Sequence, residues 1–315
     1  MSRSVGTNKQ SQPSLTRVTQ VRRKLMMASR PRARVRSDFR RRRGAASSAP
    51  LMPRLPCVAL VVPFRRQANQ DREGQLRQFE AHMDHFLRDA AVHFVVVVVV
   101  QSEDGRAFNR GQLLNVGFRE AQRHFAPSPL DAVVFHDVDL LPSAGLRQWY
   151  VRPPERGRPA HIAGPSTWSK YAMDGYDEIF FGGVTALHAA DFEACNGFPN
   201  DYWGWGMEDD QLRLRAAACG AIARGVERPP RGTGAFRDLD PVRMLELLQT
   251  RESLQAHGGL FNQKMFVPNR GPQVLDREWR GANGLRGLRY QAARREQRGL
   301  TGGAAWLQVS ARLGG

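Results

Sequence analysis

A run of seven apolar residues at Phe94–Val100, six of them valine, constrains the fold of this chain more than any other segment. β-Branched side chains pack well on a pleated sheet, and the run is much shorter than the roughly 18 apolar residues that a membrane-spanning helix requires. We therefore expect a strand that is buried in the interior of a sheet. Because every other apolar run in the sequence is shorter still, we expect the chain to contain no membrane span.

Other short apolar runs alternate with segments of helical periodicity, which is the pattern of an α/β domain. An apolar content of 41% is sufficient to build its core. Further strands are expected at 57–62, 132–135, 285–291 and 304–313. Helices are expected at 73–90, from Asn109 as N-cap, at 191–197, at 209–219 before Gly220, and at 242–256 after Asp240 as N-cap.

The basic charge of the chain is concentrated near its N-terminus. Residues 1–50 contain twelve arginines and two lysines against Asp38 alone, so they carry +13 of the net charge of +17 and leave 17 − 13 = +4 for residues 51–315. Ser, Arg and Pro without an apolar period predict a disordered tail. The tail would be a targeting peptide, a polyanion-binding arm, a juxtamembrane segment or a solvated extension. The nearly neutral remainder argues against nucleic acid as a partner.

The three cysteines, Cys57, Cys195 and Cys219, lack the spacing of a zinc site or of a CxxC motif. Their odd number allows at most one disulfide. Three buried thiols are an equally good interpretation, so the cysteines do not identify a compartment.

The segment Phe198–Gln211, FPNDYWGWGMEDDQ, combines two tryptophans with two glycines and three consecutive carboxylates. Trp203 and Trp205 offer flat apolar faces that stack on sugars, and the glycines allow the backbone to close over a ligand. A single acid here would be explained by the first turn of a helix, where it satisfies free N–H groups. The whole run favours a ligand site with candidate proton acceptors at Glu208, Asp209 and Asp210.

Two aspartates follow the strand expected at 132–135. Asp137 and Asp139 lie at positions i and i+2, so they project from the same side of an extended chain. A divalent cation would relieve their repulsion, although a turn after a strand also favours aspartate. Arg65 follows the first expected strand and Arg110 begins a helix, and both positions suit an anion such as a diphosphate.

Five segments together resemble the β-1,4-galactosyltransferase family, glycosyltransferase family 7, and occur in the family's order. They are Val62–Arg65 (VPFR), Phe108–Phe118 (FNRGQLLNVGF), Phe135–Pro142 (FHDVDLLP), Phe180–Leu187 (FFGGVTAL) and Asn196–Gln211 (NGFPNDYWGWGMEDDQ). HDVDLLP and FRDLDP are similar to the xylosylprotein β-1,4-galactosyltransferase branch, whereas GFPNDYWGWG is nearer to the branch with N-acetylglucosamine acceptors.

The resemblance implies a GT-A-like α/β fold, in which helices flank a mixed central sheet. It implies a catalytic domain at 51–315, with an inserted loop at 257–282. The implied reaction is an inverting, metal-dependent transfer of galactose from UDP-galactose, in a β-1,4 linkage, to a xylose- or N-acetylglucosamine-terminated glycan or glycoprotein. Mn²⁺ would be the cofactor, with Mg²⁺ as an alternative, and the Golgi lumen would be the compartment.

The resemblance also assigns roles to individual residues. Asp209 would be the catalytic base, with Glu208 beside it. The metal would bind Asp139, Asp238 and Asp240. The donor would contact Pro63, Phe64, Arg65, Phe108, Arg110, Asp137, Val138, Phe180 and Trp205. The acceptor would contact Gly183, Trp205, Glu208, Asp209 and Asp210.

Besides the inserted loop, which has no evident family counterpart, two motifs depart from the family pattern. Where the xylosylprotein branch has FRHLHD, with histidine metal ligands, this chain has FRDLD, so the ligand set would consist of carboxylates and would favour harder cations. Phe180 stands where many members have a tyrosine beside the donor sugar, so UDP-GalNAc and UDP-glucose are alternative donors. The tail and the missing histidines suggest another alternative, a catalytically inactive protein that binds polyanions or nucleic acid.

Overall fold

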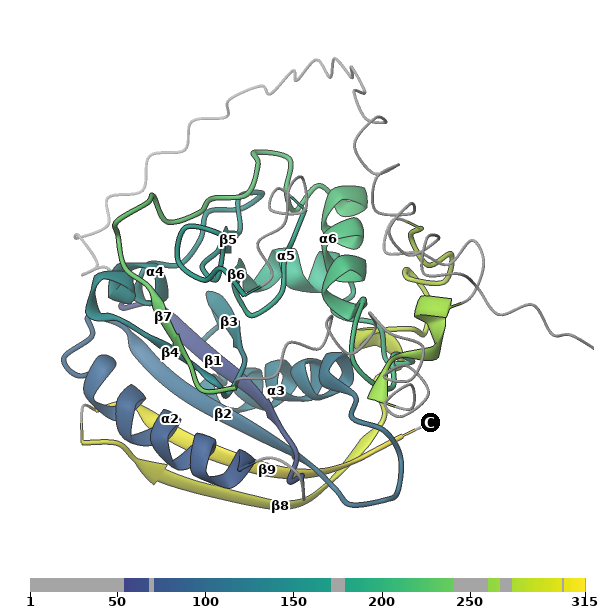
Figure 1. Ribbon diagram of the computed structural model, residues 1–315, viewed down its shortest axis with the longest axis horizontal. Coiled ribbons are helices and arrows are strands. Elements are labelled where there is room, and N and C mark those ends of the chain that lie inside the picture. The colour runs from purple at the N-terminus through teal and green to yellow at the C-terminus, as the bar shows by residue number, and fades with distance from the viewer. Residues whose placement is uncertain are drawn as a thin grey trace, which may run out of the picture. The chain divides into compact units, whose positions relative to one another are not determined.

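The computed structural model describes residues 54–67, 71–170, 179–240, 260–266, 274–301 and 303–314. Their centre is a seven-stranded sheet with the strand order β5-β6-β3-β1-β2-β9-β8 (Figure 1). The strands are β1 (Cys57–Phe64), β2 (His93–Gln101), β3 (Ala132–His136), β5 (Ala160–His161), β6 (Val184–His188), β8 (Tyr290–Gly299) and β9 (Ala305–Leu313).

The valine run forms the middle of β2, as its composition predicts. Residues 95–99 are fully buried, because β2 lies between β1 and β9 and both neighbours run parallel to it. β3 is parallel to β1 on the other side. Antiparallel strands complete both edges, with β6 and β5 beyond β3 and β8 beyond β9. The sheet is therefore mixed, which confirms the expected fold class.

Helices cover both faces of the sheet, and consecutive residues of a strand pack against opposite layers. Val61 and Val97 belong to the core beneath α3 (Arg110–Phe125), α5 (Ala189–Ala194) and α6 (Glu208–Cys219). Val62 and Val98 belong to the core beneath α2 (Arg72–Phe86) and α4 (Arg147–Val151) (Figure 1). Short 3₁₀ helices lie at Ala144–Leu146, Gln263–Phe266 and Leu285–Gly287.

Local sequence signals predict some of the helix boundaries, whereas α2 ends at Phe86 and not at the expected residue 90. The side chain of Asn109 caps α3 by accepting a hydrogen bond from the Gln112 N–H group, and Gly220 ends α6 with a left-handed φ of 83°. α5 begins at Ala189, before the expected 191, because His188 caps it through its ring nitrogen.

The prediction of a strand at 285–291 is wrong for most of this segment. A 3₁₀ helix occupies Leu285–Gly287, and β8 begins only at Tyr290. The N–H groups of Leu285 and Arg286 donate to the carbonyl and side-chain oxygens of Asn196, each at 2.9 Å, so this backbone is bonded to Asn196 and not to a partner strand. The expected loop at 257–282 includes the 3₁₀ helix Gln263–Phe266 and a turn at 277–282. The expected helix at 242–256 and the expected tail lie outside the described residues.

No helix among the described residues is long and apolar enough to cross a membrane.

Candidate active site

The candidate site lies where the parallel strands β1 and β3 end. Their carboxyl ends share one edge of the sheet, so Arg65, just after β1, and Asp137, just after β3, are brought to the same side. α3 and α6 both start at this edge and contribute their first residues, Arg110 and Glu208. Residues from four distant parts of the sequence therefore meet there.

Arg110 connects the DxD segment to the acids of α6. Its Nε donates a hydrogen bond to Asp137 Oδ1 at 2.7 Å, and its NH1 group donates to Glu208 Oε1 at 3.3 Å. Burial alone would lower the pKa of Arg110, but the charges of Asp137, Glu208 and Asp209 raise it. The guanidinium therefore stays charged and holds the carboxylates around it.

The backbone before α6 turns sharply to present its acids. Met207, the residue before the helix, has a left-handed φ of 77°, and Gly206 has a φ of 109°. Asp209 Oδ1 then accepts a hydrogen bond from the Asp210 N–H group at 3.0 Å. The acids thus lie at the positive end of the helix dipole. Stabilisation of a helix start, which would explain a single acid here, requires the same position.

Asp209 also lies directly against the glycine pair that precedes β6. A Cβ atom added to Gly182 would lie only 2.2 Å from Asp209 Oδ2. Gly183, with a φ of 72°, accepts a hydrogen bond from the Asp137 N–H group at 3.1 Å and faces the ring of Trp168. The pair therefore places Asp209 and Asp137 on the two sides of one backbone turn.

Burial changes the proton affinity of these acids. Removal from water and the neighbouring charge of Asp209 raise the pKa of Glu208 to about 7, even though Arg110 opposes the shift. Burial likewise raises the pKa of Asp209, against the opposing effect of Arg110. Glu208 Oε2 is buried and has no hydrogen-bond partner among the described residues. A buried carboxyl oxygen without a partner is suited to accept a hydrogen bond from a ligand hydroxyl group.

A second acidic cluster is assembled by a short ladder that the sequence did not reveal. β4 (Leu140–Pro142) pairs antiparallel with β7 (Phe236–Asp238), so Leu140 lies opposite Asp238. In addition, the Leu239 N–H group donates to the Asp139 carbonyl oxygen at 2.7 Å. The ladder places the segments that carry Asp139, Asp238 and Asp240, the three aspartates that the resemblance assigns to a metal, side by side although they are far apart in sequence.

Two basic side chains already lie among these aspartates. Arg72, the first residue of α2, lies 3.1 Å from Asp139 Oδ2 and 3.3 Å from Asp240 Oδ2. Lys170 Nζ lies 3.1 Å from Asp238 Oδ2. Burial and the charge of Asp137 nevertheless raise the pKa of Asp139 to about 6. The cluster is therefore held together by the chain's own cations.

The aspartate cluster fits a divalent cation in its chemistry, since carboxylate oxygens are the ligands that hard cations prefer. Burial and the charge of Asp137 raise the pKa of Asp139, while Arg72 and Lys170 act in the opposite direction. In the part of the chain that the structure describes, no three His, Cys, Asp or Glu side chains converge closely enough to hold a metal ion. A bound cation would therefore replace Arg72 and Lys170 as the partner of these carboxylates.

Trp168 connects the two acidic clusters. Its indole Nε1 donates a hydrogen bond to Asp238 Oδ2 at 3.0 Å, and its ring contacts Gly183. The ring centroid of Phe180 lies 6.1 Å from that of Trp168 and 5.2 Å from that of His161. Phe180 is thus part of an aromatic group beside the acids, which is consistent with a place near a sugar.

The side chains expected to hold the nucleotide fall into two groups, one buried and one partly exposed. Phe64 and Val138 are buried in the core beneath α2, and Pro63 is buried within β1. Arg65 lies over the ring of Phe108, with its guanidinium carbon 5.6 Å from the ring centroid. The side chains of Arg65 and Phe108 are partly exposed, as are those of Arg110 and Asp137, so a ligand could reach these four.

The WGWG segment is paired with a distant part of the chain. The Trp205 N–H group donates to the Leu260 carbonyl at 2.8 Å, and the Trp205 carbonyl accepts from the Asn262 N–H group at 3.0 Å. The rings of Trp205 and Phe261 meet edge to face at 5.7 Å. The expected inserted loop therefore supports the tryptophan segment.

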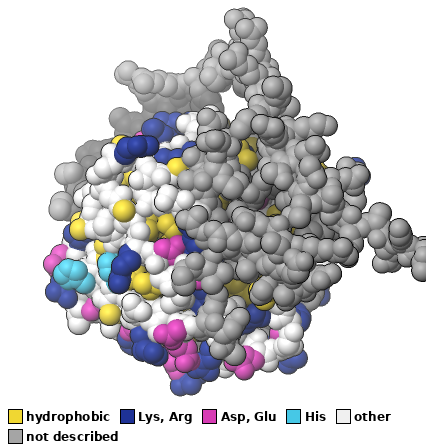
Figure 2. All heavy atoms as spheres, in the orientation of Figure 1, with side chains coloured by type: hydrophobic (Ala, Val, Ile, Leu, Met, Phe, Trp, Pro, Cys, Tyr) yellow, Lys and Arg dark blue, Asp and Glu magenta, His cyan; other side chains and the backbone are white. Residues whose placement is uncertain are grey.

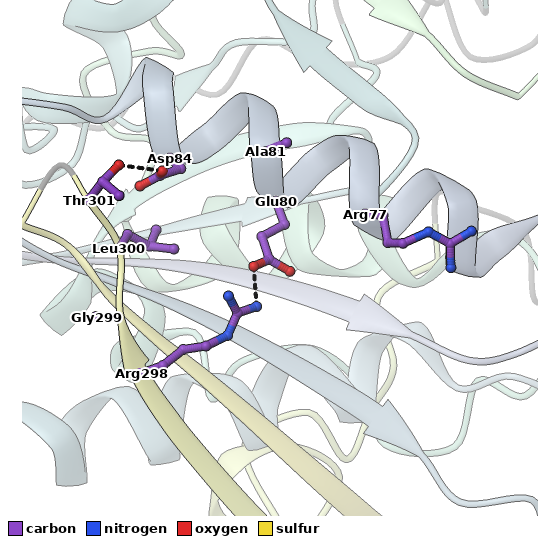
Figure 3. Close-up of a pocket in the computed structure, with 8 residues that line it drawn as sticks. All are labelled: Arg77, Glu80, Ala81, Asp84, Arg298, Gly299, Leu300 and Thr301. Carbon is purple, nitrogen blue, oxygen red and sulfur yellow. Dashed lines mark hydrogen bonds and ion pairs between the residues drawn. The ribbon is translucent and has the colours of Figure 1, made fainter.

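A surface pocket lies elsewhere, between α2 and the turn that joins β8 and β9 (Figure 3). Within it Glu80 pairs with Arg298, and Thr301 donates a hydrogen bond to Asp84. None of the candidate site residues lines this pocket. Basic and acidic side chains are interspersed over the described surface that Figure 2 shows.

Three residues of the site were not predicted from the sequence: Arg72, Trp168 and Lys170. Arg72 follows the N-cap Asp71 and has the sequence context of an ordinary helix start. Trp168 and Lys170 lie in a segment without apolar periodicity. The one available signal was electrostatic, because clustered aspartates require cations from the chain or from solution.

Comparisons with known proteins identify the family to which the chain is similar. The family model described as the N-terminal region of glycosyl transferase group 7 matches residues 11–151, and the model described as the N-terminal domain of galactosyltransferase matches residues 166–240. The chain is 40% identical over 163 residues to β-1,4-galactosyltransferase 7 of Drosophila melanogaster. It is 38% identical over 180 residues to β-1,4-galactosyltransferase 3 of Homo sapiens.

These sequence matches cover 52% and 57% of this chain but only 45% and 42% of the relatives' lengths. A solved structure matches more completely. It is a mutant of the Drosophila β-1,4-galactosyltransferase 7 in complex with manganese, UDP-Gal and xylobiose, with a TM-score of 0.62 and 30% identity. The match covers 83% of this chain and 95% of that one.

Proposed function

Since the chain belongs to the β-1,4-galactosyltransferase family, we propose that it transfers galactose from UDP-galactose to a sugar hydroxyl group, with inversion at the anomeric carbon. The observation that carries the proposal is the position of Arg110, which joins Asp137 at the end of β3 to Glu208 at the start of α6. A donor diphosphate and an acceptor hydroxyl group would meet on its two sides.

Asp209 is the proposed general base. Its partly exposed carboxylate lies at the start of α6, and the raised pKa favours acceptance of a proton from the attacking hydroxyl group. Glu208, with its unpartnered Oε2, would accept a hydrogen bond from another hydroxyl group of the substrates. Asp210, Gly183 and Trp205 complete the proposed acceptor contacts.

The donor would be held at the other end of the site. The leaving diphosphate develops negative charge, which Arg65 and Arg110 would stabilise. Phe108, Phe180 and Asp137 would contact the nucleotide and sugar, together with Pro63, Phe64, Val138 and Trp205. The buried side chains of Phe64 and Val138 would act chiefly by shaping the backbone around the nucleotide.

Asp139, Asp238 and Asp240 would hold a divalent cation, Mn²⁺ or Mg²⁺. When bound, this cation would neutralise charge on the departing diphosphate. Arg72 and Lys170 hold the same carboxylates in the arrangement described above, so these two residues keep the cluster compact.

For the acceptor we favour a xylose-terminated glycan over an N-acetylglucosamine-terminated one, because the structural relative with the greater coverage was solved with xylobiose. An alternative donor, UDP-GalNAc or UDP-glucose, is favoured by one observation. Phe180 packs between His161 and Trp168 and offers no hydroxyl group to the donor sugar.

The full chain, purified with Mn²⁺ or Mg²⁺, should be assayed for UDP release with each of the three donors and with xyloside and N-acetylglucosaminide acceptors. The proposal expects UDP-galactose and the xyloside to give the highest rate, and Asp209→Asn to lower that rate by a factor of about 100 to 10,000. Glu193→Gln, a change in an exposed ion pair with Arg119, is the matched control and should keep full activity. Absence of turnover with every pair would refute the proposal.

A further inference from the structure

Two of the three cysteines lie side by side at the ends of two helices. Cys195 directly follows α5, and Cys219 is the last residue of α6. Their Sγ atoms are 3.0 Å apart. A disulfide bond is about 2.05 Å long, so the two sulphur atoms need to approach by only about 1 Å to be bonded. The third thiol, Cys57, is buried at the start of β1, where it accepts a hydrogen bond from Arg54 NH1.

We propose that Cys195 and Cys219 are a disulfide-forming pair. The segment between them contains both tryptophans of WGWG and the three acids of α6. The bond would join the end of α5 to the end of α6 and so close this segment into a covalent loop. This assignment rests on the geometry of the two thiols and is independent of the proposed transferase activity.

The surroundings of the two thiols give them different roles in bond formation. Cys219 is half-buried and can be reached by a reagent, whereas Cys195 is fully buried. The hydrogen bond from Cys195 lowers the pKa of Cys219 to about 7, and the same contact and burial raise the pKa of Cys195. Cys219 is therefore the nucleophile that attacks first.

The oxidant is a second disulfide, such as oxidised glutathione or the active-site disulfide of an oxidoreductase. The Cys219 thiolate attacks one of its sulphur atoms, forms a mixed disulfide and releases one thiolate, which takes up a proton. Cys195 loses its proton and attacks the Cys219 sulphur, which releases the second thiol. The two protein thiols have then lost two protons and two electrons, and the external disulfide has been reduced to two thiols.

The test is direct mapping of the bond in the full chain. The purified protein is incubated with oxidised glutathione, its remaining free thiols are alkylated in denaturant, and it is digested with trypsin without reduction. We expect a cross-linked pair of peptides, 171–213 and 216–224, lighter by two hydrogens than the sum of the two. We also expect one alkylated thiol per chain, on Cys57.

Two variants make the result specific. Cys57→Ser should keep the cross-linked pair and leave no alkylated thiol. Cys219→Ser changes a half-buried position, and it should lose the pair and leave Cys195 able to be alkylated in denaturant. Three alkylated thiols in the wild-type chain after oxidation, or a cross-link that includes Cys57, would overturn the proposal.

Discussion

The guanidinium of Arg72 lies 3.1 Å from the carboxylate of Asp139, within the cluster that is proposed to bind a divalent cation. A fixed positive charge there stabilises the aspartates without a metal and also opposes its entry. Arg72 would thus lower both the stability that the protein gains from a bound cation and the affinity of the aspartates for that cation.

Replacement of Arg72 should make the protein more dependent on metal. In Arg72→Gln, partly buried carboxylates lose a charged partner, which should cost roughly 2 kcal/mol of unfolding free energy without metal. Mn²⁺ should then raise the melting temperature more in the variant than in the wild type, as differential thermal unfolding would measure. Arg152→Gln, at an exposed ion pair with Glu227, is the control. An equal response to Mn²⁺ in both proteins would contradict the prediction.

Asp209→Asn should slow the chemical step while leaving donor binding largely intact. A general base contributes a factor of about 100 to 10,000 to the rate, and asparagine cannot accept the proton. Steady-state kinetics should therefore show a fall in kcat of that size with a small change in the KM for UDP-galactose. A variant with unchanged kcat would exclude Asp209 as the base.

Gly182→Ala should lower kcat without unfolding the protein. The new methyl group would sit 2.2 Å from Asp209 Oδ2 and 2.9 Å from the ring of Phe180, so the carboxylate must move. A displacement of about 1 Å at a catalytic group can cost roughly 100-fold in rate. Gly299→Ala is the control, because its added methyl group meets no atom within 4 Å. Equal kcat in the two variants would show that Asp209 tolerates the displacement.

Glu208 should make the protein less stable as the pH rises. Its pKa is about 7 in the folded protein, against an ordinary value of 4.5, so the folded state binds the proton more tightly than the unfolded state. The resulting stabilisation is complete below pH 4.5 and is lost as the pH rises through 7. Over that window it amounts to a few kcal/mol as an order of magnitude.

Glu208→Gln cannot ionise and should remove this part of the pH dependence. Denaturant unfolding at several pH values between 4.5 and 7.5 would compare the variant with the wild type. The control Glu193→Gln, which changes an exposed carboxylate, should retain the wild-type slope. If Glu208→Gln also retained the wild-type slope, Glu208 of the wild type would have to be ionised from pH 4.5 to 7.5. That result would contradict the prediction.

The elements that the sequence predicts well are those set by local chemistry. The valine run could form only a buried strand, and Asn109 and Gly220 mark helix ends through their own backbone preferences. The acids of α6 were also placed correctly at a helix start. Their partner Arg110 is predicted from the sequence to bind an anion, but its bonds to Asp137 and Glu208 depend on how α3 and α6 pack.

The features that escaped prediction depend on contacts between distant segments. β4 and β7 are three residues each, too short for any periodicity, and they are stabilised by pairing with each other. The pairing of Trp205 with the segment around Phe261 likewise has no local signature. Such contacts are set by the tertiary fold, so residues such as Lys170 could be identified only after the chain was folded.

The place of β9 in the sheet has a consequence for how the protein folds. β9 pairs with the valine strand β2 on one side and with β8 on the other, although β1, β2 and β3 all lie much earlier in the chain. During synthesis, the most apolar strand must therefore wait with one edge open until residues 305–313 leave the ribosome. An unpaired apolar edge is a site of aggregation, so this protein should depend on chaperones during its translation and should tolerate shortening within β9 poorly.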